Sequence, residues 1–200
     1  MFSHVITRPI RTGYEAIQRH LIKRSLKTMI KNQINDIFRD LDKITNATAR
    51  SLSISPDALE FDHVHFKAES TLELEVAEEA VKEMGFIELP IANQLIAQRV
   101  AVYYLRGTTL SVAIDKPAAS AKGSHTKAIK VDHIGFVLNN KEGFEQLMQK
   151  AIPGQGPVLE KVEQRLPKIL YKLPSLAGFN LGRVEILEAS PVKVFAARHR

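Results

Sequence analysis

An alternation of apolar and polar positions occurs twice in this chain. Residues 61–67 read Phe-Asp-His-Val-His-Phe-Lys, and residues 131–137, which begin 70 positions later, read Val-Asp-His-Ile-Gly-Phe-Val. Each copy places an Asp-His pair at the start of an apolar, β-branched run, which is typical of a strand. Because side chains two residues apart share a face of a strand, Val64 and Phe66 should face a core and the two histidines of the first copy the other side. The repetition indicates an internal duplication.

The same order of elements is expected after each copy. The first should be followed by a helix capped by Ser70 or Thr71 and stopped at Gly85, and then by strands over 86–92, 99–106 and 109–115 with a turn at Gly107. The second should be followed by a helix capped by Asn140 and ended by Pro153, and then by strands over 158–162, 169–173 and 184–187. The sequence therefore predicts two βαβββ modules.

A helical segment should precede the modules. Thr12 and Glu15 match a capping box, which predicts a helix start near Gly13. The predicted helix, or pair of helices, ends near Thr45, and its apolar positions form two stripes whose phase slips between them. The first stripe is Tyr14, Ile17 and Leu21, and the second is Ile30, Ile34, Ile37, Leu41 and Ile44. Residues 47–60 read as a linker with a short helical turn from Pro56.

We therefore divide the chain into five parts. The expected parts are a helical extension with its linker (1–60), a first module (61–116), a second linker (117–129), a second module (130–190) and a tail (191–200). A chain of 200 residues with 44% hydrophobic positions can bury a shared core of this kind.

Composition narrows the chemistry. The chain has no cysteine, which excludes disulfides and thiolate metal sites and favours a reducing compartment, so we expect a cytoplasmic protein. No apolar run reaches the roughly 20 residues that a membrane-spanning helix needs. The net charge is +6, and much of the excess lies within residues 11–31. The bases there are read as a solvated helix face, with an acidic partner, a membrane surface or a targeting peptide as alternatives, and we expect no nucleic-acid partner.

Two βαβββ modules that each open with a strand histidine resemble the vicinal oxygen chelate superfamily, which contains glyoxalase I and the extradiol dioxygenases. The resemblance covers Phe61 to about Ser190 and is closest to the bacterial YecM-like proteins, which also carry a helical N-terminal extension. It implies an α+β fold in which the modules pair edge to edge and form a curved, mixed eight-stranded sheet around a cleft. The residues that carry the closer match are Asp62-His63, Glu88-Leu89 through Asn93 to Leu105, Ser111–Pro117 with Asp132-His133, and Arg165-Leu166-Pro167 ahead of Val184–Ser190.

The resemblance also implies a metal site. His63 and His133 match the first-strand ligands of the two modules, and Glu185 matches the carboxylate on the last strand. Imidazole and carboxylate suit divalent Fe, Mn, Zn or Ni, and three ligands leave open positions for a substrate with adjacent oxygens or for O₂. Asp115 could add a fourth ligand, since it lies 70 residues before Glu185, but the segment 109–115 has no Glu. The three-ligand site is the favoured interpretation.

Other polar residues have candidate roles around this site. His65 shares a face with His63 and could act as an acid or base, or it could be a hydrogen-bonded structural histidine. Arg165 is the preferred clamp for a substrate carboxylate, and Arg99, Arg106 and Lys172 are further candidates. Asn93, Tyr103 and Tyr171 could orient substrate oxygens. Asp62 and Asp132 should point away from the site and bond nearby backbone.

The leading hypothesis is a metal-dependent enzyme of the vicinal oxygen chelate type, dioxygenase-, isomerase- or lyase-like, acting on a small oxygenated, anionic metabolite. The alternative is a non-catalytic module of the same fold that binds a metal or a small ligand. A third possibility is an interaction protein whose helix over 13–44 docks a partner. The protein should be a monomer or a homodimer. Convergence of His63, His133 and Glu185 would favour the first hypothesis.

Overall fold

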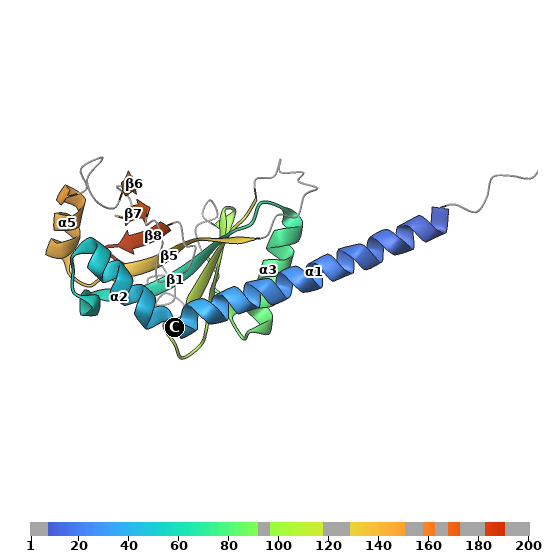
Figure 1. Ribbon diagram of the computed structural model, residues 1–200, viewed down its shortest axis with the longest axis horizontal. Helices are drawn as coiled ribbons and strands as arrows, with labels where there is room; N and C mark the ends of the chain where they lie inside the picture. Colours follow the sequence, from blue (N-terminus) through green and yellow to red (C-terminus); the bar gives the residue numbers. More distant parts are fainter. Residues whose placement is uncertain are drawn as a thin grey trace, which may run out of the picture.

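The architecture consists of two βαβββ modules and a helical N-terminal extension (Figure 1). The computed structural model describes residues 8–91, 97–117, 129–150, 158–162, 168–172 and 183–190. The extension is formed by α1 (Arg8–Arg39), α2 (Leu41–Leu52) and the short helical turn η1 (Pro56–Ala58). The first module contains β1 (Leu59–Lys67), α3 (Thr71–Glu83), β2 (Ile87–Glu88), β3 (Val100–Tyr104) and β4 (Ser111–Asp115). The second contains β5 (Lys130–Leu138), α5 (Lys141–Lys150), β6 (Val158–Val162), β7 (Lys168–Lys172) and β8 (Arg183–Leu187).

The strands form one mixed eight-stranded sheet in the order β2-β3-β4-β1-β5-β8-β7-β6. The two modules join through β1 and β5, which pair antiparallel at the centre of the sheet. Each first strand then pairs parallel with the last strand of its own module, β1 with β4 and β5 with β8. The predicted α+β fold with paired modules is confirmed.

Local signals set the helix boundaries within the modules. The Ser70 side chain accepts a hydrogen bond from the Glu73 backbone N–H and caps α3, and Asn140 does the same for Gly143 in α5. Gly85 ends the α3 region with φ +88°, and Gly107 turns between β3 and β4 with φ +79°. The predicted caps and turns are therefore confirmed. The strands β2, β3 and β4 are shorter than predicted, whereas the strands of the second module agree with their predicted bounds to within one residue.

One face of the central strands is the apolar core. Val64, Phe66, Ile134 and Phe136 are fully buried and belong to a single cluster that also contains residues of α1, α2 and α3. This is the face predicted from the alternation. Because helices cover it, the polar side chains of β1 and β5 are left to the opposite face.

The pairing of β1 with β5 contains two irregularities. Val64 pairs with Ile134, His63 with Gly135, and His65 with His133, and the register shifts by one residue on each side of this segment. The shifts leave Asp62 in β1 and Asp132 in β5 as extra residues, which makes each a β-bulge. The two bulges are related by a pseudo-two-fold axis through the pair Val64 and Ile134. A bulge re-aims the side chains beside it, and this has consequences for the site.

The helical extension differs from its prediction. Helix α1 already includes Arg8 and runs through Thr12, so the capping box and the start at Gly13 are wrong. The chain turns at Asp40, and α2 then continues to Leu52, so part of the predicted linker is helical. The helical turn at Pro56 is confirmed.

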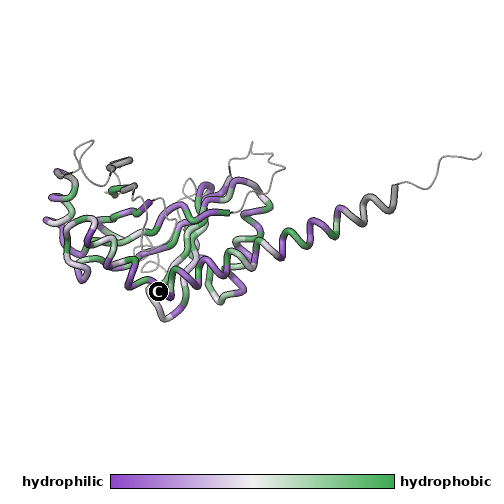
Figure 2. The backbone as a smooth tube through the Cα atoms, viewed as in Figure 1, coloured by the Kyte–Doolittle hydropathy of each residue, from purple (hydrophilic) through white to green (hydrophobic). Residues whose placement is uncertain are grey.

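Helix α1 carries its two apolar stripes on opposite sides. Ile30, Ile34 and Ile37 are buried in the core, whereas Ile17 and Leu21 are 61% and 57% exposed. The nine residues from Leu21 to Ile30 correspond to about two and a half turns, so an unbroken helix must present them in opposite directions. The N-terminal half extends beyond the sheet in Figure 1, and polar and apolar segments alternate along it in Figure 2. No helix among the described residues combines the length and the apolar content that spanning a membrane requires.

Lysines of α1 form ion pairs with acids of α3. Lys27 Nζ lies 2.9 Å from Glu79 and 2.8 Å from Glu83, and Lys31 Nζ lies 2.5 Å from Glu83. Lys23 Nζ is 3.2 Å from Glu75. Hydrogen bonds from Lys27 and Lys31 lower the pKa of Glu83 to about 2. The prediction of a merely solvated basic face is therefore wrong for these lysines, because their acidic partner is the chain itself.

Candidate metal centre

Three side chains predicted as ligands meet on the face of the sheet opposite the core. His63 Nε2 lies 3.3 Å from His133 Nε2, and Glu185 Oε2 lies 3.6 Å from the first and 3.5 Å from the second. The three residues come from β1, β5 and β8, and all are buried. The discriminating geometry for the leading hypothesis is therefore present.

Gly135 makes this convergence possible. It pairs with His63 across β1 and with Glu185 across β8, so it lies between two of the three residues. A Cβ atom at Gly135 would stand 2.4 Å from His63 Cε1 and 2.6 Å from His63 Nδ1, well inside contact distance. The His63 ring thus occupies the space that a side chain would take.

The bulged aspartates hold the imidazoles. Asp62 Oδ2 lies 2.8 Å from His63 Nδ1, and Asp132 Oδ2 lies 2.9 Å from His133 Nδ1. The prediction that both aspartates point away from the site is wrong, because strict alternation does not hold at a bulge. With Nδ1 engaged as the donor, the lone pair of Nε2 is directed to the centre of the cluster.

Residues that sequence reasoning missed support the two aspartates. Ser190 Oγ donates to Asp62 Oδ1, and Ser111 Oγ donates to the Asp62 main-chain carbonyl. Arg183 Nη1 lies 3.6 Å from Asp132 Oδ1. Alternation along β8 could have found Arg183, since it is two residues before Glu185, but no sequence pattern marks the serines. His63, the ligand candidate of the first module, is thus supported through Asp62 by residues of β4 and of the segment after β8.

Burial and the neighbouring carboxylates have opposite effects on the pKa values of His133 and His65. Burial alone would lower the pKa of His133, but hydrogen bonds to Asp132 and Glu185 outweigh it and raise that pKa. The same hydrogen bond from His133 lowers the pKa of Asp132. Burial lowers the pKa of His65, and Asp115 offsets this only in part.

The cluster has dimensions that suit a divalent metal ion. A point equidistant from the three ligand atoms lies about 2.0 Å from each of them, close to the roughly 2.0–2.2 Å of metal bonds to imidazole and carboxylate. Two neutral imidazoles and one carboxylate suit Zn, Fe, Ni or Mn. The residues present therefore fit the implied ion.

His65 and Asp115 lie beside the cluster. The His65 ring packs 4.3 Å from the His133 ring, measured between centroids, and one nitrogen each of His63, His65 and His133 lie within 4.8 Å of one another. Asp115 Oδ1 lies 3.0 Å from His65 Nε2. Repeat spacing placed Asp115 opposite Glu185, but this is wrong: Ala113 pairs with His65 as Glu185 pairs with Gly135.

The predicted substrate-binding residues have different outcomes. Tyr103 pairs with Val112 and is buried in the core beneath the helices, so its predicted role in orienting substrate is wrong. Arg99 is exposed beside β3, and its carbonyl accepts a hydrogen bond of 2.7 Å from the Lys116 N–H. Asn93 and Arg165 lie outside the described residues, as does the side chain of Tyr171, whose backbone pairs with Val184.

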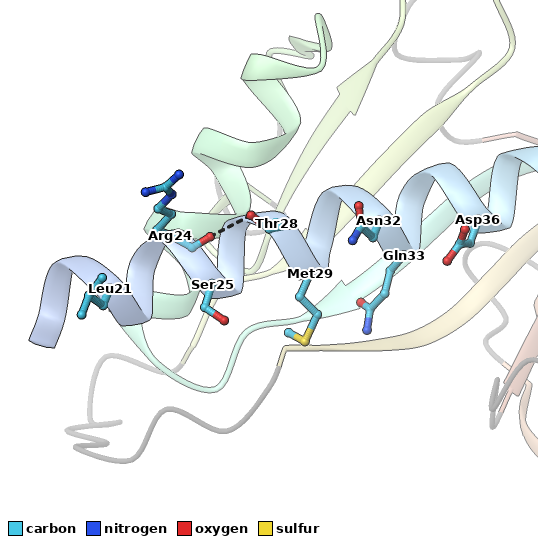
Figure 3. Close-up of a pocket in the computed structure, with 8 residues that line it drawn as sticks. All are labelled: Leu21, Arg24, Ser25, Thr28, Met29, Asn32, Gln33 and Asp36. Atoms are coloured by element: carbon cyan, nitrogen blue, oxygen red, sulfur yellow. Dashed lines mark hydrogen bonds between the residues drawn. The ribbon is translucent and has the colours of Figure 1, made fainter.

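A separate hollow follows α1 (Figure 3). Its described lining comes only from this helix and contains none of the predicted ligands, which lie on β1, β5 and β8. The Thr28 hydroxyl donates a hydrogen bond of 3.1 Å to the Arg24 carbonyl of the same helix. The lining residues are Leu21, Arg24, Ser25, Thr28, Met29, Asn32, Gln33 and Asp36. The hollow brings together no set of catalytic groups, unlike the histidine cluster.

The strand order, the joint between β1 and β5, and the meeting of first and last strands at one polar cluster are the features that the resemblance implied. The fold is that of the vicinal oxygen chelate proteins. No protein-family model matches the sequence, and no curated protein does. The closer resemblance to the YecM-like proteins stays a prediction.

Solved structures show distant similarity to the chain. The structural genomics protein EC4020 has 15% identity and a TM-score of 0.49, covering 82% of this chain and 91% of its own. Methylmalonyl-CoA epimerase from Mycobacterium tuberculosis has 17% identity and a TM-score of 0.41, covering 67% and 90%. A trihydroxybiphenyl dioxygenase from Sphingomonas wittichii has 16% identity and a TM-score of 0.37, covering 64% and 41%. Similarity at this level transfers none of their chemistry to this chain.

Proposed function

We propose that the protein is a metal-dependent enzyme of the vicinal oxygen chelate type, with His63, His133 and Glu185 as the ligands of a divalent ion. The observation that carries the proposal is the triangle of 3.3, 3.5 and 3.6 Å formed by the three ligand atoms. The ion would supply Lewis acidity for adjacent substrate oxygens, or an open position for O₂.

The chain's own residues prepare the ligands for this task. Asp62 and Asp132 each accept the Nδ1 proton of the following histidine, which keeps the ring orientation and the tautomer that ligation needs. Ser190 and Ser111 fix Asp62, so that the His63 ring does not turn away when the site is empty. Such supporting contacts raise ligand basicity and limit the reorganisation that binding would otherwise require.

A small anionic, oxygenated metabolite is the substrate class that we propose. Arg183 lies two residues before Glu185 on β8 and therefore faces the same side, and its side chain is 40% exposed. A guanidinium can bind a carboxylate through two parallel hydrogen bonds. His65 lies beside the cluster and could accept or return a proton as long as its ring does not itself bind the ion.

Metal binding tests the proposal directly. Untagged protein would be analysed for metal as purified, then stripped with a chelator and titrated with Zn²⁺, Ni²⁺, Mn²⁺ and Fe²⁺ by calorimetry at neutral pH. We expect one ion per chain, and strong loss of binding in His63→Ala, His133→Ala and Glu185→Gln. His20→Ala, which removes an exposed histidine of α1, is the matched control. Absence of metal both as purified and after titration would refute the proposal.

A binding module without turnover is the second candidate, and the burial of the ligands favours it. The side chains of His63, His133 and Glu185 are only 6%, 8% and 5% exposed. Access by a small anion separates the two candidates. If azide or oxalate changes the absorption spectrum of the Co²⁺-loaded protein, an open coordination position exists and the enzyme is favoured; an unchanged spectrum favours the module.

A further inference from the structure

The two modules differ at one pair of positions beside the proposed ligands. In the second module Gly135 on the first strand pairs with Glu185 on the last. In the first module the corresponding pair is His65 and Ala113. Each pair therefore contains one residue with a metal-binding side chain and one small residue. In the second module the metal-binding side chain is on the last strand, and in the first module it is on the first strand.

The pseudo-two-fold axis explains what this exchange does. The axis relates His63 to His133, and it relates Glu185 to Ala113, whose methyl group offers no ligand atom. His65 is the neighbour of Ala113 on the same face. Its ring can extend over Ala113 because the alanine is small, just as Glu185 lies beside Gly135. His65 is thus paired with the position that symmetry would give to a second carboxylate.

His65 also shares the environment of the proposed ligand histidines. One ring nitrogen of each of the three histidines has a carboxylate oxygen within hydrogen-bond distance, at 2.8 Å for His63, 2.9 Å for His133 and 3.0 Å for His65. A histidine that binds metal through one nitrogen commonly engages a carboxylate with the other. One nitrogen from each of the three rings lies within 4.8 Å of a nitrogen of the other two.

One nitrogen of the His65 ring has no aligned hydrogen-bond partner. Its Nε2 is buried, and although Asp115 Oδ1 is 3.0 Å away, the two atoms are not aligned as a hydrogen bond. A buried polar atom without a hydrogen bond is unfavourable, so a small rotation that aligns this nitrogen with a partner lowers the free energy. A rotation that aligns Nε2 with Asp115 leaves Nδ1 as the nitrogen available to the cluster.

We propose that His65 is a fourth ligand of the metal centre and replaces the carboxylate that is missing at Ala113. This inference rests on the proposed metal-dependent function. It also specifies the ion: three imidazoles and one carboxylate favour Zn²⁺, Ni²⁺ or Co²⁺ over Mn²⁺ and Mg²⁺.

The test uses the full chain, stripped of metal and titrated with Zn²⁺ and Co²⁺. His65→Ala and His65→Gln are both needed, because Gln keeps much of the volume and can still bond Asp115 but has no imidazole. We expect both variants to bind Zn²⁺ at least about tenfold more weakly and to change the visible absorption of bound Co²⁺, which reports the number and kind of ligands. A double variant, His65→Gly with Ala113→Glu, copies the second module's pair into the first and should restore the affinity.

The outcomes separate the two proposals. If His65→Ala and His65→Gln bind Zn²⁺ and Co²⁺ as the wild type does, while His133→Ala does not, the fourth ligand is refuted and the three-ligand centre stands. If only His65→Ala is weakened, His65 packs against His133 without ligating, and the inference is again refuted. If the wild type binds no metal, both proposals fail. Circular dichroism of each variant confirms that it is folded.

Discussion

Gly135→Ala tests the geometry of the proposed centre without removing any ligand. The added methyl group would lie 2.4 Å from His63 Cε1, 2.6 Å from Nδ1 and 3.1 Å from Nε2. Carbon atoms in contact are normally about 3.5–4.0 Å apart. The His63 ring must therefore move by about 1 Å, or the strand must shift by the same amount.

The surroundings resist that movement. The ring is held by Asp62, which is itself held by Ser190 and Ser111. We expect the overpacking to cost about 1–3 kcal/mol of unfolding free energy, which corresponds to a fall in Tm of roughly 2–12 °C for a chain of this size. A displacement of about 1 Å takes Nε2 out of bonding range, so metal affinity should fall by about 10–100-fold or more.

Thermal unfolding of the metal-free variant and calorimetric titration with Zn²⁺ measure the two effects separately. Gly143→Ala is the matched control, because the nearest atoms that a Cβ there would meet belong to the Asn140 side chain at 3.4 Å, an ordinary contact, and a glycine is replaced within helix α5. The control should leave Zn²⁺ binding intact and stabilise the fold by up to about 1 kcal/mol. A Gly135→Ala protein with unchanged Tm and unchanged Zn²⁺ affinity would show that the His63 ring does not occupy the space over Gly135.

Three further predictions follow from other contacts. Ser190→Ala should cost about 1–3 kcal/mol, because it removes a donor from buried Asp62, and it should weaken Zn²⁺ binding; unchanged binding would mean that Asp62 needs no support. Ile34→Ala should cost about 2–5 kcal/mol in urea unfolding, whereas exposed Ile17→Ala should stay within about 0.5 kcal/mol; equal costs would contradict the packing of α1. Ion pairing lowers the pKa of Glu83 from 4.5 to about 2, so the stabilisation that the Glu83 carboxylate contributes is present above pH 4.5 and is lost as the pH falls toward 2. The Tm of Glu83→Gln should therefore fall less steeply than that of the wild type over this pH range. Parallel curves would argue against the α1–α3 ion pairs.

The modules could be predicted from sequence because their signals are local. Alternation in 61–67 and 131–137 indicates which side chains enter the core, and glycines with positive φ mark the C-terminal end of α3 and the turn after β3. The convergence of His63, His133 and Glu185 followed from a resemblance rather than from local pattern, since nothing local states which strands are neighbours.

The failures arise where geometry depends on pairing between distant strands. A bulge at Asp62 exists only relative to β5, so counting along β1 could not place that side chain beside His63. Register between β1 and β4 likewise decides that Ala113, and not Asp115, corresponds to Glu185. In α1 the slip of phase left one helix or two open; the helix is continuous across the slip, and the residues of its first stripe, Ile17 and Leu21, are exposed.

The joint between β1 and β5 also determines when during folding the metal centre can exist. His63 and His133 belong to different modules, and Glu185 enters from a strand far from both in sequence, so neither half alone carries the triad. Such long-range contacts form late, after the entropy of closing the chain between them has been overcome. An ion at the centre would therefore stabilise only the docked pair, by about 2.7 kcal/mol at a free concentration of one hundred times Kd. Metal binding would therefore slow unfolding and leave the folding rate almost unchanged.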